Sequence, residues 1–219
     1  MISGLAATRP RHRWFAAVYD RMARMDEKKA RPIREFVAGG ATGAVLEIGC
    51  GTGLNLDFYD WSKVERLEAT EPDVFMLRRA EARAAKLPED VRARVRLQEA
   101  PAESLPFDAV SFDTVVSSLV FCTVSDPAAS LEEVGRVLKP GGELRLFEHV
   151  QAEGKTATVQ RFIQPLYGWM SGGCQLSRQT ESAVRQAGFD LEITQRTALG
   201  PLWPAFVGVA RKSTTQPAP

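Results

Sequence analysis

The sequence predicts an α/β domain whose core is a doubly wound parallel β-sheet. Short runs rich in apolar residues alternate with longer amphipathic segments over residues 44–150, as in such a sheet. A glycine-rich turn over 49–53 follows the first run, and Glu71 ends the second run twenty positions after Gly51. Glycines let a backbone approach a ligand closely, and a carboxylate at that distance can bind ribose hydroxyls. These features predict an adenosine-containing cofactor across the first two strands.

Five strands are predicted in the first two thirds of the chain. The stretch 112–119 is rich in valine and nearly free of charge, which is typical of a strand covered on both faces. The other four predicted strands are 44–48, 64–70, 95–98 and 143–150.

Helices are predicted between these strands from local start and stop signals. One helix should begin near Leu54, and a longer one over 73–86 has Asp73 placed to cap it. A third helix, over 127–138, has proline at its start and is stopped by Lys139-Pro140-Gly141-Gly142.

The pattern changes after residue 150. Residues 151–175 look helical and loop-like, and a periodic helix over 177–187 can end at Gly188 in a left-handed turn. Two β-rich stretches follow, 189–197 and 205–210, and their spacing alone indicates a hairpin.

The N-terminal region is basic and amphipathic. Phe15, Val18, Met22 and Met25 share one helical face, and a second helix is predicted over 26–37. This region could be a lid over the cofactor, a helix packed on the core, or a surface that meets anionic lipid. We take residues 1–40 as a helical lid segment, 41–212 as the main domain and 213–219 as a flexible tail.

The composition of the chain limits which classes of protein it can belong to. The chain has 219 residues, 44% of them hydrophobic, and a net charge of +1, so nothing global favours nucleic acid. The three cysteines are odd in number and lack metal-ligand spacing, which indicates a reducing compartment, and we expect no metal. We see neither a membrane span nor a signal peptide, and we expect a cytoplasmic protein.

The glycine turn and its surroundings resemble a known family. Glu47-Ile48-Gly49-Cys50-Gly51-Thr52-Gly53 resembles motif I of the class I S-adenosylmethionine (SAM) methyltransferases. Residues 112–120 and 136–142 resemble that family's fourth strand and the turn before its fifth. The resemblance implies a Rossmann-like sheet of seven strands with an antiparallel last strand. It also implies SAM as the cofactor.

The same resemblance implies which residues hold the cofactor. The loop after the third strand has Pro101 where many relatives have an adenine-binding aspartate, so Ala102 or Glu103 should meet the adenine. Tyr19 could close over SAM or only pack its helix. The expected cofactor residues are Tyr19, Glu47, Gly49, Cys50, Gly51, Gly53, Asn55, Glu71, Pro72, Ala102, Glu103, Ser118 and Leu119.

Other segments resemble a narrower group, which includes animal alkyl-thiol S-methyltransferases. These segments are 19–22, 147–150, 173–180 and 201–204. The likeness favours a small-molecule thiol as the methyl acceptor. Relatives with similar core motifs also methylate lipid head groups, quinones and natural products, so an O-, N- or C-methyltransferase is the alternative. A SAM-binding protein without catalysis is a third hypothesis. A nicotinamide enzyme would need the third glycine one position later.

Candidate acceptor-site residues follow from their places in the chain. His149, at the end of the fifth strand, could bind the acceptor or move its proton, or it could only pack there. Glu148 should not pair with His149, because adjacent strand residues face opposite sides. Cys174 could line the pocket or be a small buried residue, and Arg178 could bind an anion or a helix acid. Tyr167 and Trp169 could wall the pocket or belong to the core.

Overall fold

The computed structural model describes residues 27–170, 173–200 and 202–213. The predicted N-terminal helix with Tyr19, and most of the predicted tail, lie outside these residues. The strands are β1 (Gly43–Ile48), β2 (Val64–Thr70), β3 (Val95–Gln98), β4 (Phe112–Ser118), β5 (Leu138–His149), β6 (Phe189–Ala198) and β7 (Pro204–Lys212). The helices are α2 (Glu27–Val37), the 3-10 helix η1 (Leu54–Asp57), α3 (Val74–Ala84), α4 (Glu89–Arg92), α5 (Pro127–Val137), α6 (Gly154–Met170) and α7 (Thr180–Gln186).

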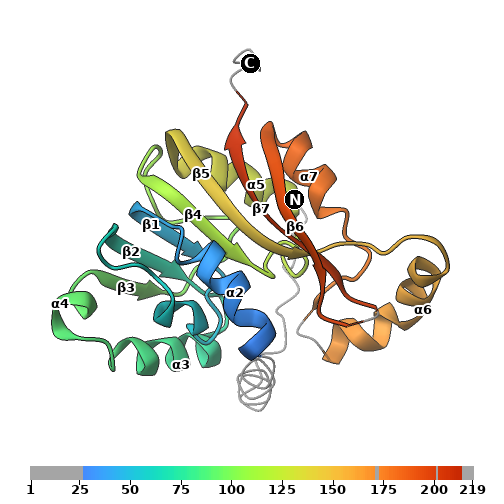
Figure 1. Ribbon diagram of the computed structural model, residues 1–219, viewed down its shortest axis with the longest axis horizontal. Helices are drawn as coiled ribbons and strands as arrows, with labels where there is room; N and C mark the ends of the chain where they lie inside the picture. Colours follow the sequence, from blue (N-terminus) through green and yellow to red (C-terminus); the bar gives the residue numbers. More distant parts are fainter. Residues whose placement is uncertain (1–26, 171–172, 201, 214–219) are drawn as a thin grey trace, which may run out of the picture.

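The seven strands form one sheet in the order β3-β2-β1-β4-β5-β7-β6, which confirms the predicted doubly wound architecture (Figure 1). Strands β1 to β5 pair in parallel, whereas β7 runs antiparallel to both of its neighbours. The last strand therefore inserts between β5 and β6. His149, at the end of β5, is held opposite Ala205 of β7.

Most predicted elements occur close to their predicted bounds. Asp73 caps α3 by accepting hydrogen bonds from the backbone of Phe75 and Met76. The helix expected near Leu54 is only the four-residue η1, and α4 was not predicted. Both are too short to produce the repeated apolar spacing on which helix prediction depends.

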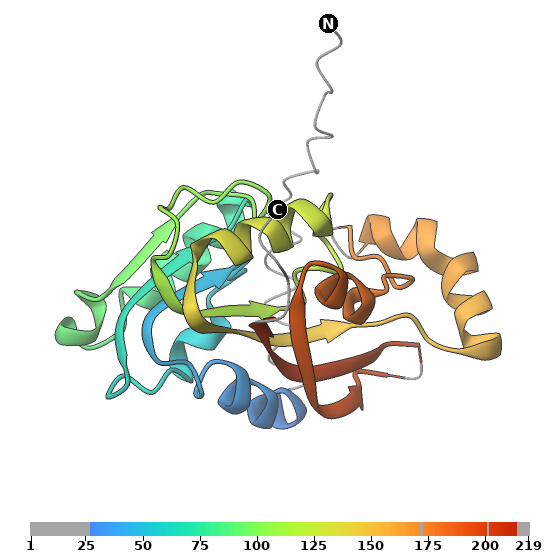
Figure 2. The ribbon, with the colours of Figure 1, turned by 90° about the horizontal axis from the view of Figure 1, so that it is seen from above.

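Helices cover both faces of the sheet. Figure 2 shows α5 and α7 on one side and α2 on the other. The larger apolar core packs α5 and α7 against the sheet, and it includes Leu131, Val134 and Val184. The second core places Ile33 and Val37 of α2 against the opposite face. The site described below is therefore closed by α2 on one face of the sheet.

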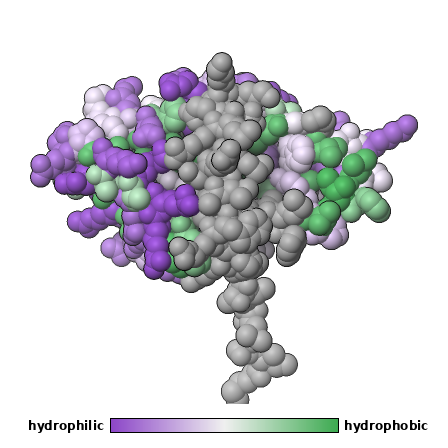
Figure 3. Space-filling view, turned by 90° about the horizontal axis from the view of Figure 1, so that it is seen from below, coloured by the Kyte–Doolittle hydropathy of each residue, from purple (hydrophilic) through white to green (hydrophobic). Residues whose placement is uncertain are grey.

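The helix α6 lies at the edge of the molecule and exposes apolar side chains. Val159, Phe162 and Leu166 are among the most exposed large hydrophobic residues, and Phe162 is 86% exposed. Figure 3 shows hydrophobic residues gathered at the end of the molecule where α6 lies. None of the helices in the described part of the chain is long and apolar enough to cross a membrane.

A buried arginine attaches the end of α2 to the sheet. Arg145 of β5, which is 9% exposed, donates hydrogen bonds to the carbonyls of Phe36 (2.6 Å) and Val37 (3.0 Å). Its guanidinium also binds Glu143 at 2.6 Å and lies over the Phe36 ring. The last carbonyls of a helix have no intrahelical partner, so this cation supplies one.

We expect Arg145→Lys to lower the free energy of unfolding by about 2–3 kcal/mol, because a hydrogen bond to a charged group contributes about 1.5–3 kcal/mol. Arg211→Lys is the matched control, since Arg211 binds the other oxygen of Glu143 from an exposed position. Its effect should stay within about 0.5 kcal/mol. Urea denaturation of both variants measures the difference. Equal losses would show that the contacts of Arg145 with α2 contribute nothing.

Candidate active site

The glycine loop after β1 has the backbone conformation that its sequence predicts. Gly49, Gly51 and Gly53 have φ angles of 58°, 59° and 76°, in the left-handed region. A Cβ atom on Gly49 would lie 2.8 Å from the Val120 side chain in the loop after β4. The two loops therefore pass so close together that only glycine fits at position 49.

A buried carboxylate organises the floor of the site. The Glu47 oxygens accept hydrogen bonds from Asn55 Nδ2 (2.7 Å) and the Tyr59 hydroxyl (2.8 Å). Asn55 also donates to Ser118 Oγ at 3.2 Å and accepts from Arg34 of α2 at 2.8 Å. Burial raises the pKa of Glu47 to about 7, although its hydrogen bonds partly oppose this shift. A cationic ligand at this position would favour the charged carboxylate.

These residues surround one cavity beside the carboxyl ends of β1 and β4. Seven of the predicted cofactor residues line it, namely Glu47, Gly49, Cys50, Gly51, Asn55, Ser118 and Leu119. Its remaining walls are Ala30, Ile33, Arg34, Thr52, Leu54 and Phe147. Sequence reasoning missed Arg34 and Phe147, because their approach depends on how α2 and β5 pack. It also missed Tyr59, which follows η1 and binds Glu47 only in the folded chain.

Glu71 supports the glycine loop from the end of β2. Its two carboxylate oxygens accept hydrogen bonds from the backbone of Gly51 (2.9 Å) and Asp73 (2.9 Å). Each carboxylate oxygen can accept a second hydrogen bond, so the predicted ribose contact is compatible with this bracing role. Pro72 follows directly in the chain.

The loop after β3 contributes less to this cavity than predicted. Ala102 is 5% exposed and packs into the larger apolar core, and neither it nor Glu103 is among the cavity's lining residues. Glu103 accepts hydrogen bonds from the backbone of Ser125 (2.8 Å) and Asp126 (3.4 Å), ahead of α5. Glu103 thus joins two loops, and its predicted adenine contact remains a prediction.

A second buried carboxylate holds the loop after β4. Glu148 accepts hydrogen bonds from Ser117 Oγ (2.8 Å) and from the backbone nitrogens of Val120 (2.9 Å), Phe121 (3.2 Å) and Cys122 (3.4 Å). Burial raises the pKa of Glu148 to about 7. Leu119 in this loop has a φ of 60°, a strained conformation for a residue with a Cβ atom. Through these hydrogen bonds the Glu148 side chain faces the end of β4 and the loop that follows it.

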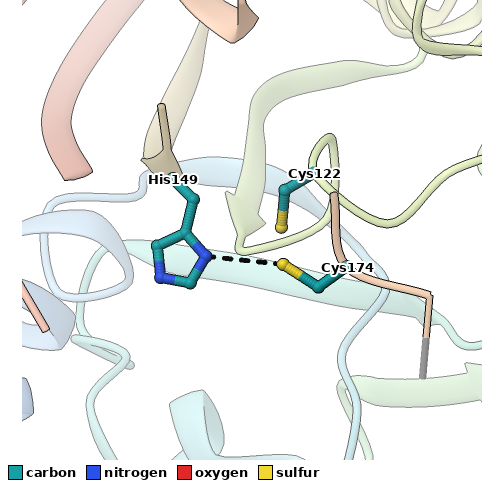
Figure 4. A group of neighbouring side chains, drawn as sticks. All are labelled: Cys122, His149 and Cys174. Carbon is teal, nitrogen blue, oxygen red and sulfur yellow. Dashed lines mark hydrogen bonds between the residues drawn. The ribbon is translucent and has the colours of Figure 1, made fainter. Parts of the chain in front are cut away.

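Three side chains that are distant in the sequence meet beyond this loop (Figure 4). His149 Nδ1 lies 3.6 Å from Cys174 Sγ, and Cys122 completes a group whose ligand atoms all lie within 4.8 Å of one another. The hydrogen bond from Cys122 and the adjacent imidazole lower the pKa of Cys174 to about 5. The same hydrogen bond, together with burial, raises the pKa of Cys122. The spacing of these cysteines in the sequence did not indicate this group.

Two of the other predicted acceptor residues, Tyr167 and Arg178, lie on the segments that precede and follow Cys174. The Tyr167 ring packs 5.8 Å from the Trp203 ring, between their centroids, and the Trp169 side chain lies outside the described residues. Arg178 donates a hydrogen bond to the Val124 carbonyl at 2.7 Å. Whether Arg178 binds an anion or pairs with a helix acid therefore stays a prediction, and the hydrogen bond to Val124 shows only how its guanidinium is anchored.

Gly49→Ala should destabilise the protein more than Gly141→Ala. Both glycines have a left-handed φ, where an L-residue costs about 1–2 kcal/mol, but a Cβ atom on Gly141 would meet nothing within 4 Å. At Gly49 the contact with Val120 adds an overpacking cost of about 1–3 kcal/mol. Chemical denaturation measures both losses, and adding Val120→Ala should recover part of the loss at Gly49. Equal losses in the two single variants would contradict close packing of the loops.

Comparison with solved structures supports the fold. A structure of a complex between the Haloferax volcanii Trm112 methyltransferase activator and a methyltransferase aligns with a TM-score of 0.70 at 19% identity, covering 97% of this chain and all of that chain. The [4+2]-cyclase SpnF aligns with a TM-score of 0.67 at 18% identity, covering 85% of this chain and 81% of that one. At these identities the likeness concerns the fold alone.

Comparison with known sequences identifies the family. A family model described as a methyltransferase domain matches residues 46–146. Thiol S-methyltransferase TMT1B of Homo sapiens is 36% identical, covering 74% of this chain and 68% of that protein. Thiol S-methyltransferase TMT1B of Rattus norvegicus is 32% identical, covering 80% and 71%. Phosphatidylethanolamine N-methyltransferase of Cereibacter sphaeroides is 29% identical, covering 90% and 92%. With its seven-stranded sheet and glycine loop, the chain belongs to the class I SAM-dependent methyltransferases.

Proposed function

We propose that this enzyme transfers the methyl group of SAM to the sulfur of a small thiol. The observation that carries the proposal is the buried nitrogen of His149 at the end of β5. Nε2 of this ring is buried and has no hydrogen-bond partner among the described residues. Buried polar atoms normally have hydrogen-bond partners, so a methyl-acceptor molecule that donates a hydrogen bond to Nε2 would supply the missing partner. The similarity to two thiol S-methyltransferases supports sulfur as the acceptor atom.

His149 lies on the side of β5 that faces the cofactor cavity. Successive strand residues point to opposite faces, so Phe147 and His149 share one face and Glu148 lies on the other. Phe147 lines the cavity described above. Figure 4 shows the second ring nitrogen of His149 pointing away from both cysteine sulfurs. Nδ1 of His149 is thus in contact with Cys174, whereas Nε2 is available to bind a methyl-acceptor molecule.

The chemistry favours a dry site of this kind. Bound SAM supplies an electrophilic methyl on a sulfonium, which the acceptor sulfur attacks in line to form the methyl thioether and S-adenosylhomocysteine. A thiolate and a sulfonium neutralise each other in this step, so a site that excludes water need not oppose it. The role of His149 is to take the thiol proton before the transfer. The hydrogen bonds of Glu47 and Asn55 position the cofactor end of the site.

A second candidate is methylation of nitrogen or oxygen on a lipid-like acceptor. The similarity to a phosphatidylethanolamine N-methyltransferase covers nearly the whole of both chains. The exposed Phe162 and Leu166 of α6 would suit a large apolar molecule. The purified enzyme should therefore be assayed for S-adenosylhomocysteine release with thiols and with matched amines, alcohols and phosphatidylethanolamine. Thiol-dependent release, with the thioether identified by mass spectrometry, supports the first candidate. Release only with the amine or lipid supports the second.

We expect His149→Gln to slow methylation of an alkyl thiol at pH 7. A thiol with a pKa of about 8.5 is about 3% ionised at pH 7, so assisted proton removal is worth at most about 30-fold. The loss in kcat/KM should shrink with a more acidic aryl thiol, and also at a pH above the pKa of the alkyl thiol. Calorimetric SAM binding should not change and serves as the control for folding. An equal loss with every thiol at every pH would show that His149 has only a structural role.

We expect SAM to bind more tightly as the pH rises from 6 to 7. Glu47 has a pKa of about 7, and the positive charge of SAM favours its ionised form, so binding below pH 7 releases a proton. Affinity should rise by up to about tenfold per pH unit below this pKa and level off above it. Glu47→Gln, which cannot release this proton, should remove the dependence. Calorimetry in buffers of different ionisation enthalpy counts the proton directly, and a count of zero would contradict a cation beside Glu47.

A further inference from the structure

The group formed by Cys122, His149 and Cys174 has the composition of a soft-metal site. It offers two thiol sulfurs and one imidazole nitrogen, all buried. Zinc bound at about 2.3 Å to sulfur and about 2.0 Å to nitrogen in a tetrahedron separates those two ligand atoms by about 3.5 Å. The distance between His149 Nδ1 and Cys174 Sγ is 3.6 Å. One pair of ligand atoms thus already has about the separation that a single ion requires, and all three lie within 4.8 Å of one another.

We propose that Cys122, His149 and Cys174 bind a thiophilic divalent cation, with Zn²⁺ as the type ion. Both cysteines coordinate as thiolates, with any remaining thiol proton passing to solvent, and the neutral imidazole coordinates through Nδ1. Two thiolates balance the charge of a divalent ion, which matters because an uncompensated charge is costly in a buried site. Soft sulfur ligands favour zinc over magnesium or calcium, which prefer oxygen.

The backbone of each ligand is anchored by other groups, and the Cys122 thiol itself donates a hydrogen bond to the Leu119 carbonyl at 3.4 Å, which cation binding would replace. Cys122 donates its backbone N–H to Glu148 and accepts a hydrogen bond from the Gln175 backbone at 2.8 Å. The carbonyl of Cys174 accepts from Gln164 Nε2 at 3.0 Å, and that of His149 accepts from the Thr180 hydroxyl at 3.1 Å. The sulfurs and Nδ1 are therefore held together before a cation arrives, which lowers the cost of binding it.

The site would have three protein ligands and one open position. In the described part of the chain, the group contains no fourth histidine, cysteine or acid. Three ligands with an open fourth position are typical of zinc sites that exchange a water or a small molecule. A disulfide between Cys122 and Cys174 is the competing use of the two sulfurs, but it would not employ the nitrogen of His149 that faces them.

The proposal of a cation site follows from the geometry of these three side chains and does not depend on the proposed function. The two are nevertheless linked, because both involve His149. A cation on Nδ1 leaves the ring proton on Nε2, which then cannot accept a proton from a thiol. The proposed methyl transfer therefore belongs to the cation-free enzyme, and Zn²⁺ should inhibit it.

Cobalt spectroscopy tests the site on the full-length, chelator-treated protein kept reduced with a phosphine. One equivalent of Co²⁺ should give the near-ultraviolet sulfur-to-cobalt charge-transfer band and the strong visible bands of tetrahedral cobalt. Excess Zn²⁺ should remove both. Cys122→Ser and Cys174→Ser should each weaken binding by at least about 100-fold, since loss of a ligand exceeds the 10- to 100-fold cost of losing an outer partner. Cys50→Ser is the matched control, because Cys50 is a buried free cysteine outside the group.

X-ray absorption of the Zn²⁺-loaded wild-type protein provides a measurement that needs no variant. Two sulfur ligands at about 2.3 Å and at least one nitrogen at about 2.0 Å would support the site. A wild-type protein that gives no cobalt bands, or a zinc shell without sulfur, would overturn it, as would loss of the bands in Cys50→Ser alone. Thiol methylation that continues unchanged in the Zn²⁺-loaded enzyme would instead overturn the proton-accepting role of His149 and leave the cation site intact.

Discussion

The position of β1 between β2 and β4 is the constraint on which the site depends. All three strands are parallel, so their carboxyl ends meet at one edge of the sheet. The chain leaves β1 and β4 in loops that diverge, and ligands bind in the crevice that such a reversal of strand order creates. Glu47 at the end of β1 and Ser118 at the end of β4 reach the same Asn55 for this reason. The cofactor cavity is thus a consequence of strand order.

Buried carboxylates keep the loops at this edge in place. Glu47, Glu71 and Glu148 accept hydrogen bonds from backbone or side-chain donors that strands and helices leave without partners. Burial raises the pKa of Glu47 and Glu148 to about 7, so keeping these carboxylates ionised at neutral pH costs free energy. Carboxylates serve here because they can accept several hydrogen bonds at once. The strained Leu119 lies in a loop fixed in this way, which is typical of backbone near a functional site.

The proposed acceptor side is built differently from the cofactor side. It is formed by the end of β5, the loop after β4 and the segment between α6 and α7, which Gln175 joins to Cys122 by a backbone hydrogen bond. Its chemistry resides in His149 and two cysteines and not in a glycine loop. In our proposals these groups bind a thiol, accept its proton or bind a soft cation. Whether a cation occupies Nδ1 of His149 decides which of these they do. In our proposal, acceptor choice is a property of this side, while the fold is shared by proteins of other activities.

The sequence by itself determined the order of the strands and of the longer helices between them, the glycine loop and the cap of α3. Each of these is a local feature: an apolar period, a left-handed φ that requires glycine, or an acid next to the amides it binds. Only the tertiary structure decided that Arg34 and Phe147 wall the cavity, that Arg178 binds a carbonyl, and that Cys122, His149 and Cys174 meet. Residues from separate segments come together through strand register and helix packing. Their proximity is fixed by the whole core, which no short stretch of sequence encodes.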